Sequence, residues 1–231
     1  MYLKDIIRRV RNRLDDKRGP RYLWDDQELI DYTNDTIRDA AIRANLTVQD
    51  DIPIVFTQNP DLTYVSKYAL PSGYLDIKSV RLLSLPNITL ARTSMRRQES
   101  YYGGRPTQNG KPWGYAVDLT MPGLGEDTGI QVRAITFIGT PLEADTAMVD
   151  VIRLPGLIEY DYDVPEIDEI WHPDLLFGIT ALAYLKRDSD TFDQKKSDRD
   201  FERFEERFGE RLSAVTIRER QAEAPFEMIV S

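Results

Sequence analysis

The chain has 231 residues, with 30 Lys and Arg against 39 Asp and Glu, which gives a formal charge of −9. Because it holds no cysteine and a single histidine, His172, one chain can form no disulfide, no Cys-ligated zinc site and no multi-histidine metal site. A hydrophobic content of 41% with 30% charged residues is typical of a globular protein long enough to bury a core.

The first 50 residues predict two amphipathic helices. In the first, the apolar positions from Leu3 to Leu14 recur at helical spacing. The opposite face carries four arginines: Arg8, Arg9, Arg11 and Arg13. The second helix begins after Asp25, and Glu28 stands three residues later, as in a capping box. Charges interrupt every apolar run here, so we expect no signal peptide and no membrane span, and a soluble protein made inside a cell.

Residues 51–164 change from helical periodicity to short alternating runs separated by turns that contain Pro or Gly. Six to eight such runs predict a small antiparallel β-sandwich or barrel.

Helical periodicity returns after Pro165. His172-Pro173-Asp174 opens a nearly all-apolar helix, which we expect at the centre of a bundle. A long charged helix follows over about residues 192–222, with arginines at every fourth position: Arg199, Arg203, Arg207 and Arg211. After Pro225 comes an apolar tail that either folds back or docks on another chain: Phe226, Met228, Ile229 and Val230.

These elements predict an α+β fold with a discontinuous helical domain. Residues 1–50 and 165–222 form a four-helix bundle, residues 51–164 form the inserted β domain, and residues 223–231 form an extended C-terminal docking tail.

The most suggestive cluster for chemistry is acidic, and it contains no Lys or Arg: Glu159, Asp161, Asp163, Glu166, Asp168, Glu169 and Asp174. Asp161, Asp163, Glu166 and Asp168 are the ligand candidates for a metal-dependent hydrolase. The segment lacks the glycine and the terminal glutamate of a calcium loop, so we favour a solvated or pore-lining segment. His172 is either a general base or, as its place at a helix start favours, a capping residue.

A DNA-binding module is a further alternative. Residues 81–111 hold six basic side chains against one acidic. The candidates for phosphate contacts are Arg92, Arg96, Arg97, Arg105 and Lys111. The net charge of −9 opposes nonspecific DNA binding, so we favour subunit contacts for the arginines of the two charged helices.

Four stretches occur in an order that resembles the tailed-phage head-to-tail adaptors of the connector or tail tubular A-like kind. They are residues 24–30 (WDDQELI), 68–77 (YALPSGYLDI), 112–115 (PWGY) and 164–176 (VPEIDEIWHPDLL). The resemblance implies a structural protein with no catalytic residue and no cofactor. It implies a homo-oligomeric ring, commonly of twelve copies, at the head–tail junction of the virion, made in the host bacterial cytoplasm.

The partners implied by the resemblance are the portal protein and a tail nozzle or tail tube protein, with no membrane. Genomic DNA passes through the lumen without sequence-specific binding. The tail residues Phe226, Met228, Ile229 and Val230 are the candidates for docking on the portal. The eight helix arginines are the candidates for subunit contacts, and the acidic residues from Glu159 to Glu169 are the candidates for the lumen wall.

Overall fold

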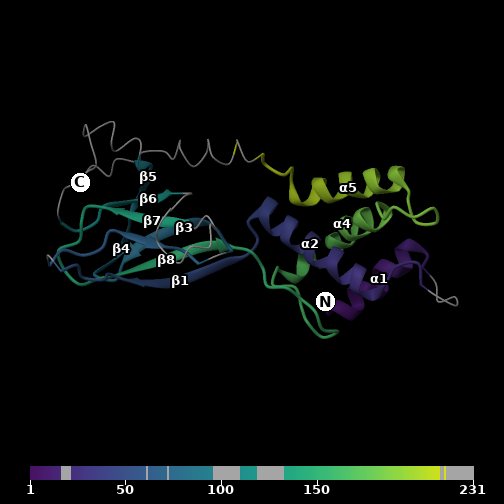
Figure 1. Ribbon diagram of the computed structural model, residues 1–231, viewed down its shortest axis with the longest axis horizontal. Helices are drawn as coiled ribbons and strands as arrows, with labels where there is room; N and C mark the ends of the chain where they lie inside the picture. The colour runs from purple at the N-terminus through teal and green to yellow at the C-terminus, as the bar shows by residue number, and fades with distance from the viewer. Residues whose placement is uncertain are drawn as a thin grey trace. The chain divides into compact units, whose positions relative to one another are not determined.

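The computed structural model describes residues 1–16, 22–60, 62–71, 73–95, 110–118, 133–213 and 216. The chain divides into two compact units: Met1–Thr47 with Leu154–Leu212, which holds helices, and a unit built on Val48–Arg153, which holds strands. Within the described ranges, four α-helices and two small sheets make the fold α+β (Figure 1), which confirms the predicted class.

The helical unit is organised around one apolar helix. Its described helices are α1 (Leu3–Leu14), α2 (Asp26–Ala44), α4 (His172–Tyr184) and α5 (Gln194–Phe208), with a 3₁₀ turn η1 (Glu169–Trp171) before α4. Helix α4 contacts each of the other three. This central place agrees with its nearly all-apolar sequence, because a helix that is hydrophobic on all sides needs neighbours on all sides.

Local sequence explains how these helices begin and which faces they bury. The predicted capping box is present at the start of α2, where Asp25 accepts N–H groups of the first turn and Glu28 accepts the Asp25 N–H. The apolar stripes of all four helices meet in one core, which includes Leu3, Ile6, Val10, Leu29, Ile37, Leu175, Ile179, Phe204 and Phe208.

Helix α5 ends earlier than the sequence predicts. The described helix stops at Phe208 rather than continuing toward residue 222. Gly209 adopts a φ of 83°, which favours glycine, and its N–H bonds back to the Glu205 carbonyl. Arg43 of α2 donates a hydrogen bond of 2.8 Å to the Gly209 carbonyl, so a side chain from another helix satisfies the end of α5.

The strand unit holds two sheets in its described part. The first has the order β1-β8-β3-β4, from β1 (Val48–Val55), β8 (Thr146–Arg153), β3 (Tyr74–Leu82) and β4 (Leu85–Thr89). The second has the order β2-β7-β6-β5, from β2 (Lys67–Ala69), β7 (Ala134–Ile138), β6 (Gly114–Asp118) and β5 (Ala91–Thr93). Side chains of both sheets share one core, including Val80, Val149, Val151, Ile135 and Phe137.

Of the predicted antiparallel sandwich or barrel, the barrel alternative is wrong. The described strands form two separate sheets and no closed barrel. The pairing is also not antiparallel throughout. One pair of strands, β5 with β6, is parallel, and in this pair Ala91 lies opposite Gly114. A Cβ at position 114 would lie 2.9 Å from the Ala91 carbonyl oxygen, so this close approach requires glycine.

Candidate interaction surfaces

The acidic segment lies against the helices and is fixed to them through its backbone. The side-chain amide of Asn34 on α2 both donates to and accepts from the backbone of Ile158, each at 2.9 Å. The carbonyl oxygen of Asp163 accepts the Leu3 N–H at 2.9 Å, and that of Asp161 accepts the Lys4 N–H at 3.1 Å. Residues 158–163 are therefore bound to both α1 and α2.

Three of the acidic side chains organise the segment itself. The Asp163 carboxylate accepts the N–H groups of Glu159 and Tyr160 at 2.8 Å each, and these bonds lower the pKa of Asp163. Glu166 accepts the Gly156 N–H at 2.8 Å, and Asp168 accepts the Ile170 N–H at 3.0 Å at the start of η1.

The ligand candidates of the metal-dependent hydrolase alternative are Asp161, Asp163, Glu166 and Asp168. In the parts of the chain that the structure describes, no three His, Asp or Glu side chains gather as metal ligands would.

A hollow of about 700 Å³ lies where the acidic segment meets the outer face of α2. Its lining combines carboxylates with apolar side chains, namely Asp31, Asp35, Glu159, Ile30, Leu157 and Tyr160. We call these six residues the acidic hollow. Leu157 is 55% exposed and Tyr160 is 72% exposed, so the hollow offers accessible apolar surface beside its carboxylates.

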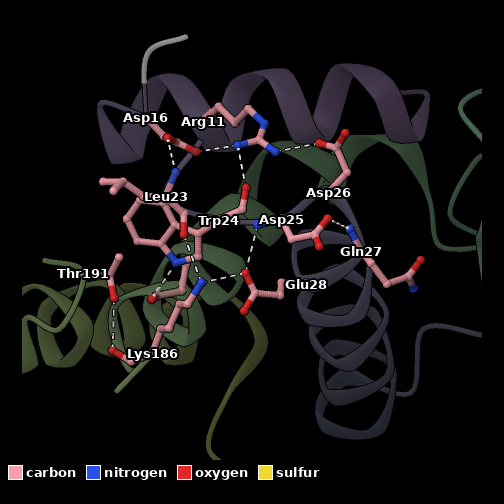
Figure 2. Close-up of polar contacts among 11 residues, drawn as sticks. Arg11, Asp16, Leu23, Trp24, Asp25, Asp26, Gln27, Glu28, Lys186 and Thr191 are labelled. Carbon is pink, nitrogen blue, oxygen red and sulfur yellow. Dashed lines mark hydrogen bonds and ion pairs between the residues drawn. The ribbon is translucent and has the colours of Figure 1, made fainter. Parts of the chain in front are cut away.

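The arginines of α1 separate into two groups. Arg8 and Arg9 are exposed and Arg13 is half-buried, but Arg11 is buried and departs from the predicted surface face. Its guanidinium group contacts the carboxylates of Asp16 and Asp26 and donates to the Trp24 carbonyl at 3.0 Å (Figure 2). Arg11 therefore joins α1 to the residues that precede α2.

The same neighbourhood joins α2 to the end of α4, as Figure 2 shows. The Lys186 ammonium donates to the Leu23 carbonyl and to Glu28, at 2.9 and 2.8 Å. Burial opposes the charge of Glu28, but hydrogen bonds from Lys186 and from the Asp25 N–H lower its pKa overall. This network has a structural role in holding three helices together.

The arginines of α5 and Arg211 beyond it are exposed, and three of these four have a carboxylate partner within the chain. Arg199 pairs with Asp200 at 3.1 Å, Arg207 with Asp174 at 3.6 Å and Arg211 with Asp39 at 3.5 Å.

Arg203 instead contacts an aromatic ring that an arginine of α1 also contacts. The guanidinium carbons of Arg203 and Arg13 lie 5.6 and 4.2 Å from the ring centre of Phe177 on α4. We call Arg9, Arg13, Arg203, Arg207 and Phe177 the arginine platform. The helical spacing places arginines on α1 and on α5, but only the packing of both helices on α4 brings the two sets together.

His172 is buried at the first residue of α4. Its Nε2 lies 2.9 Å from the Ile167 carbonyl oxygen, and its Nδ1 lies 2.8 Å from the amino group of Met1. Burial lowers the pKa of this imidazole. Both ring nitrogens are engaged by groups of the chain, an arrangement that fits a structural role at the helix start.

The basic segment 81–111 is only partly within the described residues. Arg92 forms a double hydrogen bond with Asp76, at 2.7 and 3.0 Å, and this pairing raises the pKa of Arg92 although burial opposes it. Arg96, Arg97 and Arg105 lie outside the described residues, whereas Lys111 is exposed. A guanidinium group held by a carboxylate is poorly placed to bind phosphate. The portal-docking candidates Phe226, Met228, Ile229 and Val230 also lie outside the described residues.

The model of a family described as SU10 adaptor protein matches residues 1–228. No curated protein matches the chain. None of the helices in the described ranges combines the length and the apolar character that crossing a lipid bilayer requires.

Proposed function

The chain belongs to the SU10 adaptor protein family, which is a family of phage head–tail adaptors, and from this premise we propose how it acts. Copies of the protein form a ring under the portal, commonly of twelve, and offer a platform on which tail proteins assemble. The match over residues 1–228 carries this proposal, because it spans the helices and the strands together. The protein is a structural component of the virion that acts through its surfaces and without catalysis.

We propose that the four helices form the bundle that builds the wall of this ring. Exposed carboxylates of the acidic segment then face the lumen. Of the six candidates, Asp163 is half-buried and Glu159 lines the acidic hollow, which leaves Asp161, Glu166, Asp168 and Glu169 for the lumen wall. Negative charge on the wall repels the DNA phosphates and lets the genome pass without adhering. The net charge of −9 for each copy agrees with such a channel.

The C-terminal residues Phe226, Met228, Ile229 and Val230 provide the contact with the portal in this proposal. They are apolar, follow Pro225 and stand in a chain of which 30% of the residues are charged. An apolar terminal segment gains free energy by docking in a groove of another protein. The strand unit is left to contact the tail nozzle or tail tube protein.

Co-sedimentation with purified portal rings of the same phage tests the proposal. The full chain is expected to sediment with the rings, whereas a variant that lacks residues 224–231 stays in the supernatant. A matched control replaces Glu227 with Gln, because this change keeps the length and the apolar side chains of the tail and binding is expected to persist. Retained binding of the truncated, folded variant would contradict the docking role of the tail. Failure of the full chain to bind would contradict the adaptor function itself.

A further inference from the structure

The two surfaces of the helical unit carry complementary charges. Resting on the ring proposed above, we propose that the arginine platform of one copy docks in the acidic hollow of the next copy. The platform is built by α1, α4 and α5, whereas the hollow is built by α2 and the acidic segment. Since the two surfaces are different, each copy presents its platform to one neighbour and its hollow to the other.

Three of the four arginines of the platform have no carboxylate partner among the described residues, whereas Arg207 pairs with Asp174. Within the described residues, Arg9, Arg13 and Arg203 form no ion pair with any carboxylate. Arg13 and Arg203 both lie over the ring of Phe177, and their guanidinium groups keep donors for a partner. Contact with the ring restrains both side chains before a partner arrives, which reduces the entropy lost on binding.

The hollow complements the platform with carboxylates that are exposed and have no ion-pair partner among the described residues. The carboxylates of Asp35 and Glu159 form no ion pair in the part of the chain that the structure describes, and both residues are exposed. The exposed side chains of Leu157 and Tyr160 stand on either side of Glu159 in the sequence and line the same hollow. Asn34 holds this edge of the segment on α2, so the hollow is preformed.

Both surfaces have the composition of an interface centre. Arginine and tyrosine are over-represented among the residues that contribute most to binding, and here they stand on opposite partners. A contact between two different surfaces of identical copies is heterologous, and such contacts generate rings when the rotation closes.

DNA phosphates are the rival occupant of the platform. They suit arginine equally well, but the protein carries a net charge of −9 and the acidic hollow would then stay uncovered. A second copy satisfies both surfaces at once, and for this reason we assign it as the occupant.

The absence of native cysteine allows a direct test by disulfide trapping. An Arg203→Cys variant and an Asp35→Cys variant are mixed in equal amounts under mild oxidation. The mixed disulfide is expected to exceed its statistical share several-fold. Arg187→Cys, an exposed arginine outside both surfaces, replaces Arg203→Cys as the control and is expected to give the statistical share. A statistical share for the Arg203→Cys mixture as well would overturn the proposal.

Charge reversal gives a second test with an internal rescue. We expect the Arg13→Glu/Arg203→Glu variant and the Asp31→Lys/Asp35→Lys variant each to lose at least about tenfold in self-association, because like charges face each other at the contact. A 1:1 mixture is expected to regain it, since each altered surface then meets its complement. Each variant is first checked for an unchanged circular dichroism spectrum.

The outcomes of these experiments separate the interface from the adaptor function. Portal binding without the rescue would leave the adaptor function standing and overturn the proposed contact. The Arg13→Glu/Arg203→Glu variant could instead lose affinity for duplex DNA while the trapping experiment gives no mixed disulfide. This result would assign the platform to DNA phosphates and would also overturn the proposed contact between copies. Mixed disulfides without portal binding would support the contact and contradict the adaptor function.

Discussion

The indole Nε1 of Trp24 donates a hydrogen bond of 3.0 Å to the carbonyl oxygen of Ala183, which is 159 residues away in the chain. Trp24 is buried just before α2, and Ala183 lies in the last turn of α4. The bond therefore closes the helical unit between a segment before the strands and a segment after them. Residues 24–30 are one of the stretches that carry the family resemblance, and this hydrogen bond gives the tryptophan at position 24 a structural role.

We predict that Trp24→Phe lowers the free energy of unfolding by about 2 kcal/mol, from the lost hydrogen bond and the smaller ring in a packed site. The Ala183 carbonyl still accepts the Lys186 N–H, so the loss stays moderate. Urea denaturation followed by circular dichroism measures it. Trp171→Phe is the control, because within the described residues its indole forms no hydrogen bond. Equal losses for the two variants would show that the bond contributes nothing.

A second prediction concerns the crossing of α2, α4 and α5. A Cβ at Gly178 would lie 2.6 Å from Thr36 Cγ2 and 3.0 Å from two ring carbons of Phe204. Alanine favours helix by about 1 kcal/mol over glycine, but overpacking costs about 1–3 kcal/mol. We expect Gly178→Ala to be net destabilising in urea denaturation.

Thr36→Ser removes the clashing methyl group and supplies the control for Gly178. In a double-mutant cycle, Thr36→Ser should recover part of the stability that Gly178→Ala loses, with the remainder due to Phe204. Strictly additive effects of the two changes would contradict the close approach of α4 and α2.

The features that the sequence predicts correctly depend on neighbours in the chain. The capping box of Asp25 and Glu28 involves residues three apart, and the apolar sequence of α4 requires a central place whatever surrounds it. The α+β class follows from the change of periodicity along the chain. Each of these is fixed by local preference or by the amount of apolar surface to bury.

The features that the sequence misses depend on distant partners. The parallel pairing of β5 with β6 depends on which strands become neighbours, and only the close approach at Gly114 marks it. Gly209 marks the end of α5 locally, but the hydrogen bond that its carbonyl accepts from Arg43, far away in sequence, depends on how α2 packs. Phe177 is an ordinary apolar position in the sequence, and its contact with two arginines appears only after α1 and α5 pack on α4.

The third prediction is a pH dependence that arises from His172. Burial holds the pKa of this imidazole in the folded protein below the value of 6.5 for a free histidine. As the pH falls below about 6.5, the unfolded chain binds the proton first, so the free energy of unfolding decreases, by at most about 1.4 kcal/mol per pH unit. The stability is fully present above this range.

Urea denaturation at pH 7, 6 and 5 measures this slope. His172→Gln should reduce the slope between pH 6.5 and 5, because 172 is the position of the single histidine. The lowered pKa values of Asp150 and Asp163 affect stability at more acidic pH, so they do not obscure this window. Identical slopes for the two proteins would contradict the assignment to His172.

The last prediction separates the arginines of α1 by burial. The Asp16 side chain is 2% exposed and faces the Arg11 guanidinium, so Arg11→Met leaves a buried carboxylate without its cation. Such a change costs about 3–5 kcal/mol, which should appear as a large loss in the free energy of unfolding measured with urea. Arg8→Met is the matched control on the same helix. Arg8 is exposed and, among the described residues, pairs only with Asp5, at 2.9 Å, so the loss is expected to be below about 1 kcal/mol. If Arg11→Met were as mild as Arg8→Met, Arg11 would have to be free to face a neighbouring copy, as the helical pattern alone suggests.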